Sequence, residues 1–183
     1  KDGLAITNGA QLSTAIAALA CFDSGRLVLA AELAAAMSIE ALLGASRAFH
    51  PAVHKLRPYP GAIACAANIC TLTAGSGLLD SVPEKLQDAY SIRCTPQVIG
   101  ASRDSIAFAA DQLSIELNSA TDNPLILLDA EEGSNKAFSA GMFHGEPVGM
   151  AAETLKVAVG EIASLSERRL YRLTTGSLSQ RLP

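Results

Sequence analysis

Three polar side chains recur at every third position in the segment QDAYSIRCTPQV, namely Gln87, Tyr90 and Arg93. Side chains at this spacing lie on one face of a helical or tightly wound segment, so an amide, a phenol and a guanidinium can converge on one small object. Arginine suits bidentate capture of a carboxylate, and a phenol beside it can exchange a proton with a reacting centre. A site for an amino or carboxylic acid is thus one interpretation of the trio. The residues alone favour the alternative, a hydrogen-bonded helix entry in which Arg93 pairs with Asp88 or Asp104.

Two further residues are candidates for contacts with a ligand. Asn8 lies in ITNGAQ, where Asn-Gly is typical of a turn, although an amide at the mouth of a helix can also hold a ligand group. Phe143 lies in the glycine-flanked segment SAGMFHGEP, and we expect it to pack as the wall of a pocket.

The histidines do not predict a metal site. His144 and Glu146 are two residues apart and do not share a helix face. His50 and His54 have a spacing that can bind metal on a helix, but Pro51 stands between them and no glutamate follows.

Composition narrows the class of protein. Of the 183 residues 49% are hydrophobic and 17% are charged, and the net charge is −4, so the clustered Lys and Arg of a nucleic-acid partner are missing. No basic amphipathic stretch suits a membrane surface, and Glu32 and Glu40 interrupt the longest apolar run, which favours a buried helix over a membrane span. The four cysteines lack CxxC spacing and are expected to be reduced core residues of a cytoplasmic protein.

Helical periodicity dominates the elements that must position these candidates. It predicts a first apolar segment at 11–21 and helices from about Arg26 to Leu43, from Pro60 to the Gly75-Ser76-Gly77 breaker, from beyond Pro96 to the NSATDNP cluster, and from about His144 to Leu173. Asp23 and Ser24 are candidate N-caps of the helix that Gly44 would end, and the prolines between residues 50 and 60 indicate a loop. The trio would then sit on a turn that feeds the helix after Pro96.

The two longest predicted helices carry apolar stripes with a period of seven: Ile99, Ile106 and Leu113 in one, and Val148, Leu155 and Ile162 in the other. Alanine-rich helices of this length need neighbours to cover such stripes. Residues 125–138 differ, because two apolar stretches flank an acidic turn with Gly133, which predicts a β-hairpin. The expected fold class is all-α: a long-helix bundle in one domain, residues 1–183, with a small hairpin at 125–138.

Five motifs occur in an order that resembles the aromatic amino acid ammonia-lyases, most nearly the histidine branch: ITNGAQ, QDAYSIRCTPQVIGASRD, NSATDNPL, MFHGEPVGMAAE and SLSERR. The likeness covers essentially the whole chain. It implies an all-helical homotetramer built around a central bundle, with each active site assembled from three subunits. Because the chain opens without an initiator methionine and ends in mid-pattern, it is expected to be an internal fragment, the central portion of a longer lyase.

The resemblance also implies the reaction, which is the non-oxidative elimination of ammonia from an aromatic L-amino acid, here L-histidine giving urocanate. The substrate amine meets an electrophilic methylidene-imidazolone (MIO), a base removes the β-proton, and an unsaturated acid remains. Residue by residue, Asn8 is similar to the amide that contacts substrate and electrophile, and Arg93 to the clamp on the substrate carboxylate. Tyr90 and Gln87 resemble the catalytic phenol and amide that line the electrophile, and Phe143 the aromatic wall beside it.

Two features depart from the family's pattern. The methylidene-imidazolone forms from Ala-Ser-Gly, a triplet that this sequence lacks and that the family places upstream of ITNG, so the chain alone is expected to be inactive. Met142 stands where many relatives carry asparagine, and it supplies bulk without hydrogen-bond donors.

Two other functions stay open. An aminomutase of the same family would use the electrophile to move the amine, giving a β-amino acid. A non-catalytic helical scaffold would keep the bundle without the electrophile. The fumarase and aspartase group is disfavoured, because its signature loop needs a Met-Pro pair that does not occur here.

Overall fold

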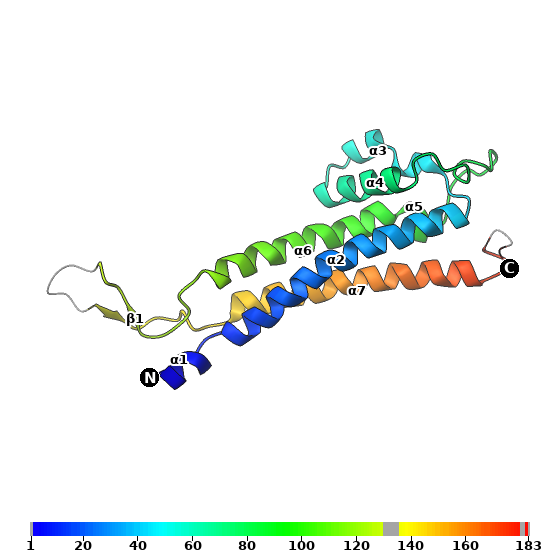
Figure 1. The fold of residues 1–183 in the computed structure, drawn as a ribbon. Coiled ribbons are helices and arrows are strands. Elements are labelled where there is room, and N and C mark those ends of the chain that lie inside the picture. Colours follow the sequence, from blue (N-terminus) through cyan, green and yellow to red (C-terminus); the bar gives the residue numbers. More distant parts are fainter. Residues whose placement is uncertain (1, 130–135, 180–181, 183) are drawn as a thin grey trace.

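The computed structural model describes residues 2–129, 136–179 and 182. Three long helices pack along one another in an elongated bundle (Figure 1): α2 (Gln11–Ala41), α6 (Thr95–Leu117) and α7 (Glu146–Thr174). Shorter elements are α1 (Asp2–Thr7), the 3-10 helix η1 (Ser46–Phe49), α3 (Pro51–Lys55), α4 (Pro60–Leu72) and α5 (Tyr90–Arg93). The antiparallel pair β1 (Leu125–Ile126) and β2 (Ala137–Phe138) forms the predicted hairpin, whose turn with Gly133 lies outside the described residues. The all-α fold class is confirmed.

The predicted stripes of α6 and α7 form the core of the bundle. All six are buried: Ile99, Ile106, Leu113, Val148, Leu155 and Ile162. They belong to one hydrophobic cluster together with the small buried residues of α2, so the three helices share a single core. A seven-residue period keeps such residues facing neighbouring helices along the whole length of a bundle.

The first long helix is longer than predicted. α2 runs for 31 residues without a break, so neither Asp23 nor Ser24 begins a helix. The predicted caps are wrong because Ser24 lies inside the helix, where its hydroxyl donates to the carbonyl of Ala20 at 2.7 Å. The helix ends at Ala41, ahead of Gly44. A second correction is that η1 and α3 occupy part of the expected proline loop.

By length and composition alone, α2 could cross a membrane, and it is the one helix within the described ranges that could. The predicted interruption by Glu32 and Glu40 is not enough to exclude a span by these two criteria. Core helices of soluble proteins pass the same test, and α2 packs against α4, α6 and α7. It also buries the side chain of Glu32, which is 1% exposed. A buried ion pair inside a helix bundle identifies α2 as a core helix of this fold.

Backbone contact between α4 and α6 fixes the helix that follows the trio. A Cβ added to Gly61 would lie 2.1 Å from the carbonyl oxygen of Gly100, and a Cβ added to Gly100 would lie 2.4 Å from the Cα of Ala62. Any larger side chain would push the two helices apart, since neither backbone can move alone. The N-terminal half of α6 is therefore held rigidly against α4.

Glu32 joins three helices. Its Oε1 pairs with Nη1 of Arg103 on α6 at 2.9 Å, and its Oε2 accepts from Nδ2 of Asn68 on α4 at 2.7 Å. The Glu32 carboxylate thus has two hydrogen-bonding partners in place of water, as a buried charge requires. Burial, reinforced by this nearby carboxylate, raises the pKa of the Cys65 thiol, so the thiol stays protonated.

One arginine of the segment SERRLYRL, near the end of α7, is buried. Arg169 is 3% exposed, and its Nη2 donates to Oγ of Ser166 at 3.2 Å. Its Nη1 has no hydrogen-bond partner within the described part of the chain, and burial lowers the pKa of this side chain. Arg168 is exposed and pairs with Glu167.

Replacing Glu32 by glutamine is expected to lower the free energy of unfolding by about 2 kcal/mol, because the partly buried charge of Arg103 loses its counter-ion. Urea unfolding followed by circular dichroism measures this as a lower midpoint with an unchanged slope. The matched control is Glu153→Gln, which breaks the exposed pair with Lys156 and should cost less than about 1 kcal/mol. Equal shifts for the two variants would contradict the structural role of Glu32.

Candidate functional site

The structure brings the predicted trio together on and beside α5. Arg93 donates from Nη1 to Oε1 of Gln87, and its guanidinium carbon lies 4.9 Å from the centre of the Tyr90 ring. Ile92, on the same short helix, is fully buried and anchors this turn in the core. The phenol side chain of Tyr90 is 72% exposed. An amide, a phenol and a guanidinium therefore form one contacting group at the surface, which we call the Arg93 cluster.

The alternative pairing of Arg93 is wrong. Asp88 pairs with Nζ of Lys85 at 2.5 Å and accepts from the backbone N–H of Ala45 at 2.7 Å. Asp104 accepts from the backbone N–H of Gly61 at 2.8 Å. Both carboxylates are engaged elsewhere, which leaves most of the five N–H donors of the Arg93 guanidinium for another acceptor.

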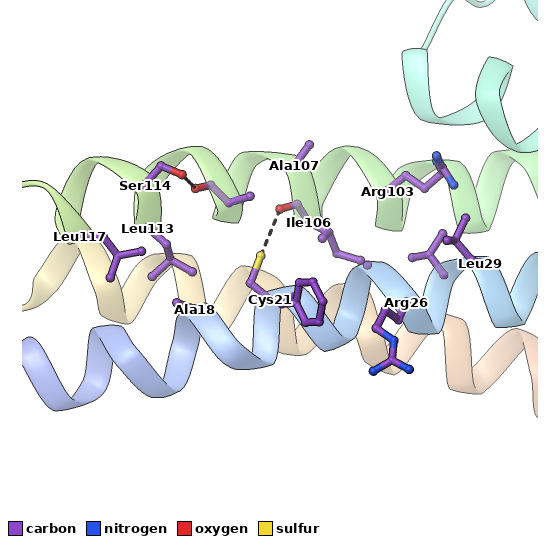
Figure 2. A pocket seen from close by; sticks show the side chains of 14 residues that line it. Ala18, Cys21, Arg26, Leu29, Arg103, Ile106, Ala107, Leu113, Ser114 and Leu117 are labelled. Atoms are coloured by element: carbon purple, nitrogen blue, oxygen red, sulfur yellow. Dashed lines mark hydrogen bonds between the residues drawn. The ribbon is translucent and has the colours of Figure 1, made fainter.

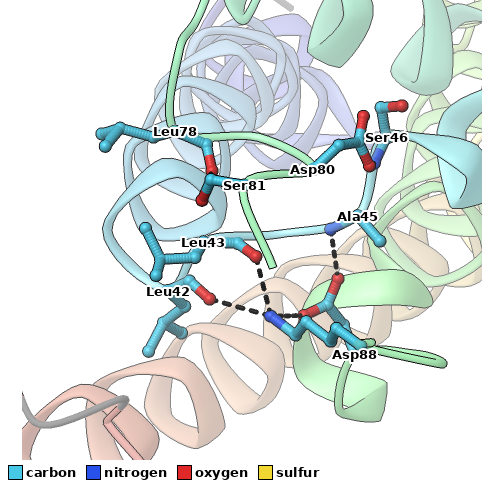
Figure 3. A network of polar contacts seen from close by, with 9 residues as sticks. Leu42, Leu43, Ala45, Ser46, Leu78, Asp80, Ser81 and Asp88 are labelled. Carbon is cyan, nitrogen blue, oxygen red and sulfur yellow. Dashed lines mark hydrogen bonds and ion pairs between the residues drawn. The ribbon is translucent and has the colours of Figure 1, made fainter. Parts of the chain in front are cut away.

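A polar network holds the segment that leads into the Arg93 cluster (Figure 3). Lys85 donates to the carbonyl oxygens of Leu42 and Leu43, both at 2.9 Å, and so satisfies the end of α2. A cation at this end also suits the helix dipole. Together with the bonds of Asp88, these contacts tie the residues just before Gln87 to the end of the longest helix.

A second group of contacts surrounds Asn8 at the junction of α1 and α2. Its Nδ2 donates to Oδ1 of Asp122 at 2.7 Å, and the same oxygen accepts from the backbone N–H of Asn123 at 2.7 Å. Oδ1 of Asn123 accepts in turn from the backbone N–H of Ala140 at 2.7 Å. Asn8 is thus more than the shaper of a turn, because a side chain far along the chain binds it. We call Asn8, Asp122 and Asn123 the Asn8 cluster.

Phe143 lies at the same end of the molecule as the Asn8 cluster. A Cβ added to Gly145 would lie 3.1 Å from the Cβ of Ala10, so the start of α7 touches the start of α2. Phe143 and Met142 are both exposed, and neither is packed into the core. The ring of Phe143 is therefore available as a wall, although the described chain does not enclose a pocket with it.

The two clusters lie at opposite ends of the bundle. Asn8 and Phe143 lie where α2 and α7 begin, whereas the Arg93 cluster lies at the far end, beside α5 (Figure 1). α7 alone has 29 residues, which corresponds to about 43 Å at the usual helical rise. One copy of this chain cannot bring the predicted site residues onto one small molecule.

A groove lies between the two clusters and contains none of the predicted site residues. It runs between α2 and α6 with a volume of about 630 Å³ (Figure 2). Its lining is mostly apolar and includes Ala18, Cys21, Phe22, Leu29, Ile106 and Leu113. With few polar groups to orient a substrate, this groove suits packing better than chemistry.

The histidines make local hydrogen bonds. Nδ1 of His50 accepts from the backbone N–H of Ala52 at 3.2 Å, and Nε2 of His54 lies 3.1 Å from the carbonyl oxygen of Ala48. Nδ1 of His144 accepts from the backbone N–H of Glu146 at 3.2 Å. Among the residues with a described position, no three His, Cys, Asp or Glu side chains gather as metal ligands.

Sequence reasoning missed Asp122 and Lys85 as partners of the site. The NSATDNP segment was a visible signal, since Asn and Asp cluster there, but such clusters are also typical of helix ends. Lys85 carried no signal at all, because its acceptors are backbone carbonyls of a distant helix.

Comparisons with known proteins identify the family of the chain. The sequence profile of the aromatic amino acid lyase family matches residues 1–183. Histidine ammonia-lyase from Gloeobacter violaceus is 46% identical over 185 residues, which cover 100% of this chain and 35% of that protein. Histidine ammonia-lyase from Sorangium cellulosum is 44% identical over 98% of this chain and 35% of its own length. The chain therefore spans about a third of the length of these relatives.

Solved structures of the same kind superpose closely. Tyrosine aminomutase from Streptomyces globisporus matches with a TM-score of 0.90 and 34% identity, over 100% of this chain and 38% of that chain. Histidine ammonia-lyase from Trypanosoma cruzi matches with a TM-score of 0.83 and 39% identity, over 96% of this chain and 32% of that chain. With a profile match along its whole length and a bundle shared with these enzymes, the chain belongs to the aromatic amino acid lyase family.

Proposed function

We propose that residues 1–183 form one helical domain, the central portion of an enzyme that eliminates ammonia from an aromatic L-amino acid, converting L-histidine to urocanate. Membership of the family supports the reaction class, and the similarity to histidine ammonia-lyases supports the substrate. The observation that carries the proposal is the Arg93 cluster, in which a guanidinium, a phenol and an amide touch one another at the surface.

Arg93 is the clamp on the substrate carboxylate. Its contacts with Gln87 and with the ring of Tyr90 hold the guanidinium in place before a ligand arrives. A pre-oriented guanidinium binds a carboxylate with less loss of side-chain entropy than a free one. Tyr90 and Gln87 are the catalytic phenol and amide, since both reach the same exposed surface.

Residues of both clusters suit a methylidene-imidazolone group. The N–H groups of Asn8 and Gln87 and the O–H of Tyr90 are donors of the kind that its carbonyl oxygen would accept. Phe143 offers an exposed aromatic face beside it. When bound, the group supplies an electrophilic carbon for the substrate amine. Ala-Ser-Gly is absent from the sequence, so the group would come from residues outside these 183.

The enzyme is a homotetramer in this proposal, because the separation of the two clusters requires several subunits to complete one site. A long apolar face of α2 supports such an assembly. Its exposed side chains are Leu12, Ile16, Leu19, Phe22, Leu29, Leu33 and Met37. An exposed face of this size marks a surface for association. The partners are small amino acids and further subunits, with no role for nucleic acid or membrane, in a cytoplasmic protein.

The 183-residue chain by itself is expected to be inactive. It lacks the precursor of the electrophile, and its own two clusters cannot meet.

The proposal is tested with the complete enzyme by offering histidine, phenylalanine and tyrosine separately and following both ammonia and the ultraviolet-absorbing product. Release of ammonia from histidine, with urocanate as the product, is expected. Product from phenylalanine or tyrosine alone would keep the reaction class and change the substrate.

The two other functions give distinct results in the same assay. The match to tyrosine aminomutase from Streptomyces globisporus favours an aminomutase as the second candidate. A β-amino acid without free ammonia would establish that function. If all three amino acids stay unchanged, the non-catalytic scaffold replaces both enzymes.

A further inference from the structure

Asp122 lies where two distant segments of the chain meet. Its Oδ1 accepts from Nδ2 of Asn8 at 2.7 Å, across 114 positions of sequence, and from the backbone N–H of Asn123 at 2.7 Å. The bond to Asn123 fixes the carboxylate relative to its own backbone. Asn8 is therefore held by an acceptor that cannot easily turn away.

The backbones beneath this bond are fixed as well. Gly9 has a φ of +102°, and a Cβ added there would lie 2.6 Å from the carbonyl oxygen of Thr121. Positive φ and this close approach both favour glycine. Asn123 binds the next segment through the backbone N–H of Ala140 at 2.7 Å and Oγ of Ser139 at 3.2 Å. The distance between Asn8 and Asp122 is thus set by backbone packing.

We infer that Asp122 is a positioning residue for the reaction, an inference that rests on the ligand role proposed for Asn8. An ionised carboxylate only accepts hydrogen bonds, so it selects the NH₂ end of the Asn8 amide. Turning the amide over would place its carbonyl oxygen against Oδ1 of Asp122, which is repulsive. Asp122 therefore sets the orientation of the Asn8 amide relative to the ligand. The remaining N–H and the carbonyl oxygen of Asn8 meet the ligand in one fixed order.

A double-mutant cycle in the complete enzyme separates positioning from general support of the fold. Asp122→Asn keeps the shape of the side chain but removes the charge, so the oxygen held by the N–H of Asn123 accepts from the Asn8 amide without charge assistance. We expect kcat/KM to fall about tenfold or more in the wild-type background. In the Asn8→Ala background the same change should alter kcat/KM less than about twofold, because the group that Asp122 orients is gone.

The matched control is Asp80→Asn. Asp80 also accepts from a backbone N–H, that of Ser46 at 2.9 Å. Hydrogen bonds from the side chain and the backbone of Ser46 hold the pKa of the Asp80 carboxyl below its usual range. It lies outside both clusters, so its replacement should leave kcat/KM unchanged in either background. Thermal unfolding of every variant shows whether the fold is kept.

The outcomes distinguish this inference from the function on which it rests. An Asp122→Asn effect of equal size in both backgrounds, or no effect in either, would overturn the positioning role and leave the proposed function standing. A harmless Asn8→Ala change would instead remove Asn8 from the site.

A graded pair of variants covers the case in which Asn8→Ala leaves too little activity to measure. Asp122→Ala removes the acceptor altogether, so kcat/KM should fall further than in Asp122→Asn, which keeps a neutral acceptor. An Asp122→Ala enzyme that is as active as Asp122→Asn would contradict the inference.

Discussion

Arg93→Ala is expected to lower kcat/KM of the complete enzyme by about two to three orders of magnitude. A loss of this size is expected because the substrate carboxylate loses a bidentate, charge-assisted contact. Arg93→Lys should recover only part of the loss, because an ammonium keeps the charge but not the paired donors. Steady-state kinetics with histidine measures both variants. The effect should appear at every substrate concentration below saturation, since the contact is made on binding.

The control for this loss is Arg57→Ala. The guanidinium carbon of Arg57 lies 5.1 Å from the centre of the Tyr59 ring, so it repeats the arginine–tyrosine stacking of the Arg93 cluster outside the proposed site. Its removal should leave kcat/KM within about twofold of wild type, in line with the usual weight of an exposed contact. A loss of similar size at Arg57 and Arg93 would assign the Arg93 effect to folding, and a nearly normal Arg93→Ala enzyme would refute the carboxylate clamp.

Periodicity predicted α6 and α7 well, because their buried residues are large and recur every seven positions, as at Ile99, Ile106 and Leu113. α2 was divided wrongly, because its buried stripe consists of small or polar residues such as Thr14, Ala17 and Ser24. A cap at Ser24 contributes only about 1 kcal/mol. The contacts that α2 makes with α6 and α7 along its length outweigh that local preference. These contacts cannot be read from the sequence, because they depend on how the helices pack.

The Arg93 cluster was predictable because its members lie close together in the sequence, at residues 87–93. The Asn8 cluster was not, since the bond from Asn8 to Asp122 spans 114 positions. The paired charges of Asp88 and Lys85 show a related limit. Sequence reasoning considered Asp88 and Asp104 as partners of Arg93, and only the fold places Lys85 and the N–H of Ala45 against Asp88.

The separation of the two clusters leads to the second large expected effect, which is recovery of activity by mixing two inactive subunits. Asn8→Ala and Arg93→Ala enzymes should each be nearly inactive as pure oligomers. If one site takes Asn8 from one subunit and Arg93 from another, random co-assembly leaves both residues intact in about a quarter of the sites. Co-expression with two different affinity tags, sequential purification and an ammonia assay measure this fraction.

A second mixture provides the control, because Tyr90→Ala and Arg93→Ala damage the same cluster. Tyr90 and Arg93 touch within one subunit, so every site of that mixture contains one of the two lesions and activity should stay at the level of the inactive parents. Recovery in the first mixture and not in the second requires that the two ends of the bundle serve different sites. Absence of recovery in both, with mixed oligomers present, would mean that one subunit supplies Asn8 and Arg93 together. The described bundle excludes that arrangement unless α2 or α7 bends, because both helices separate the two clusters along their length.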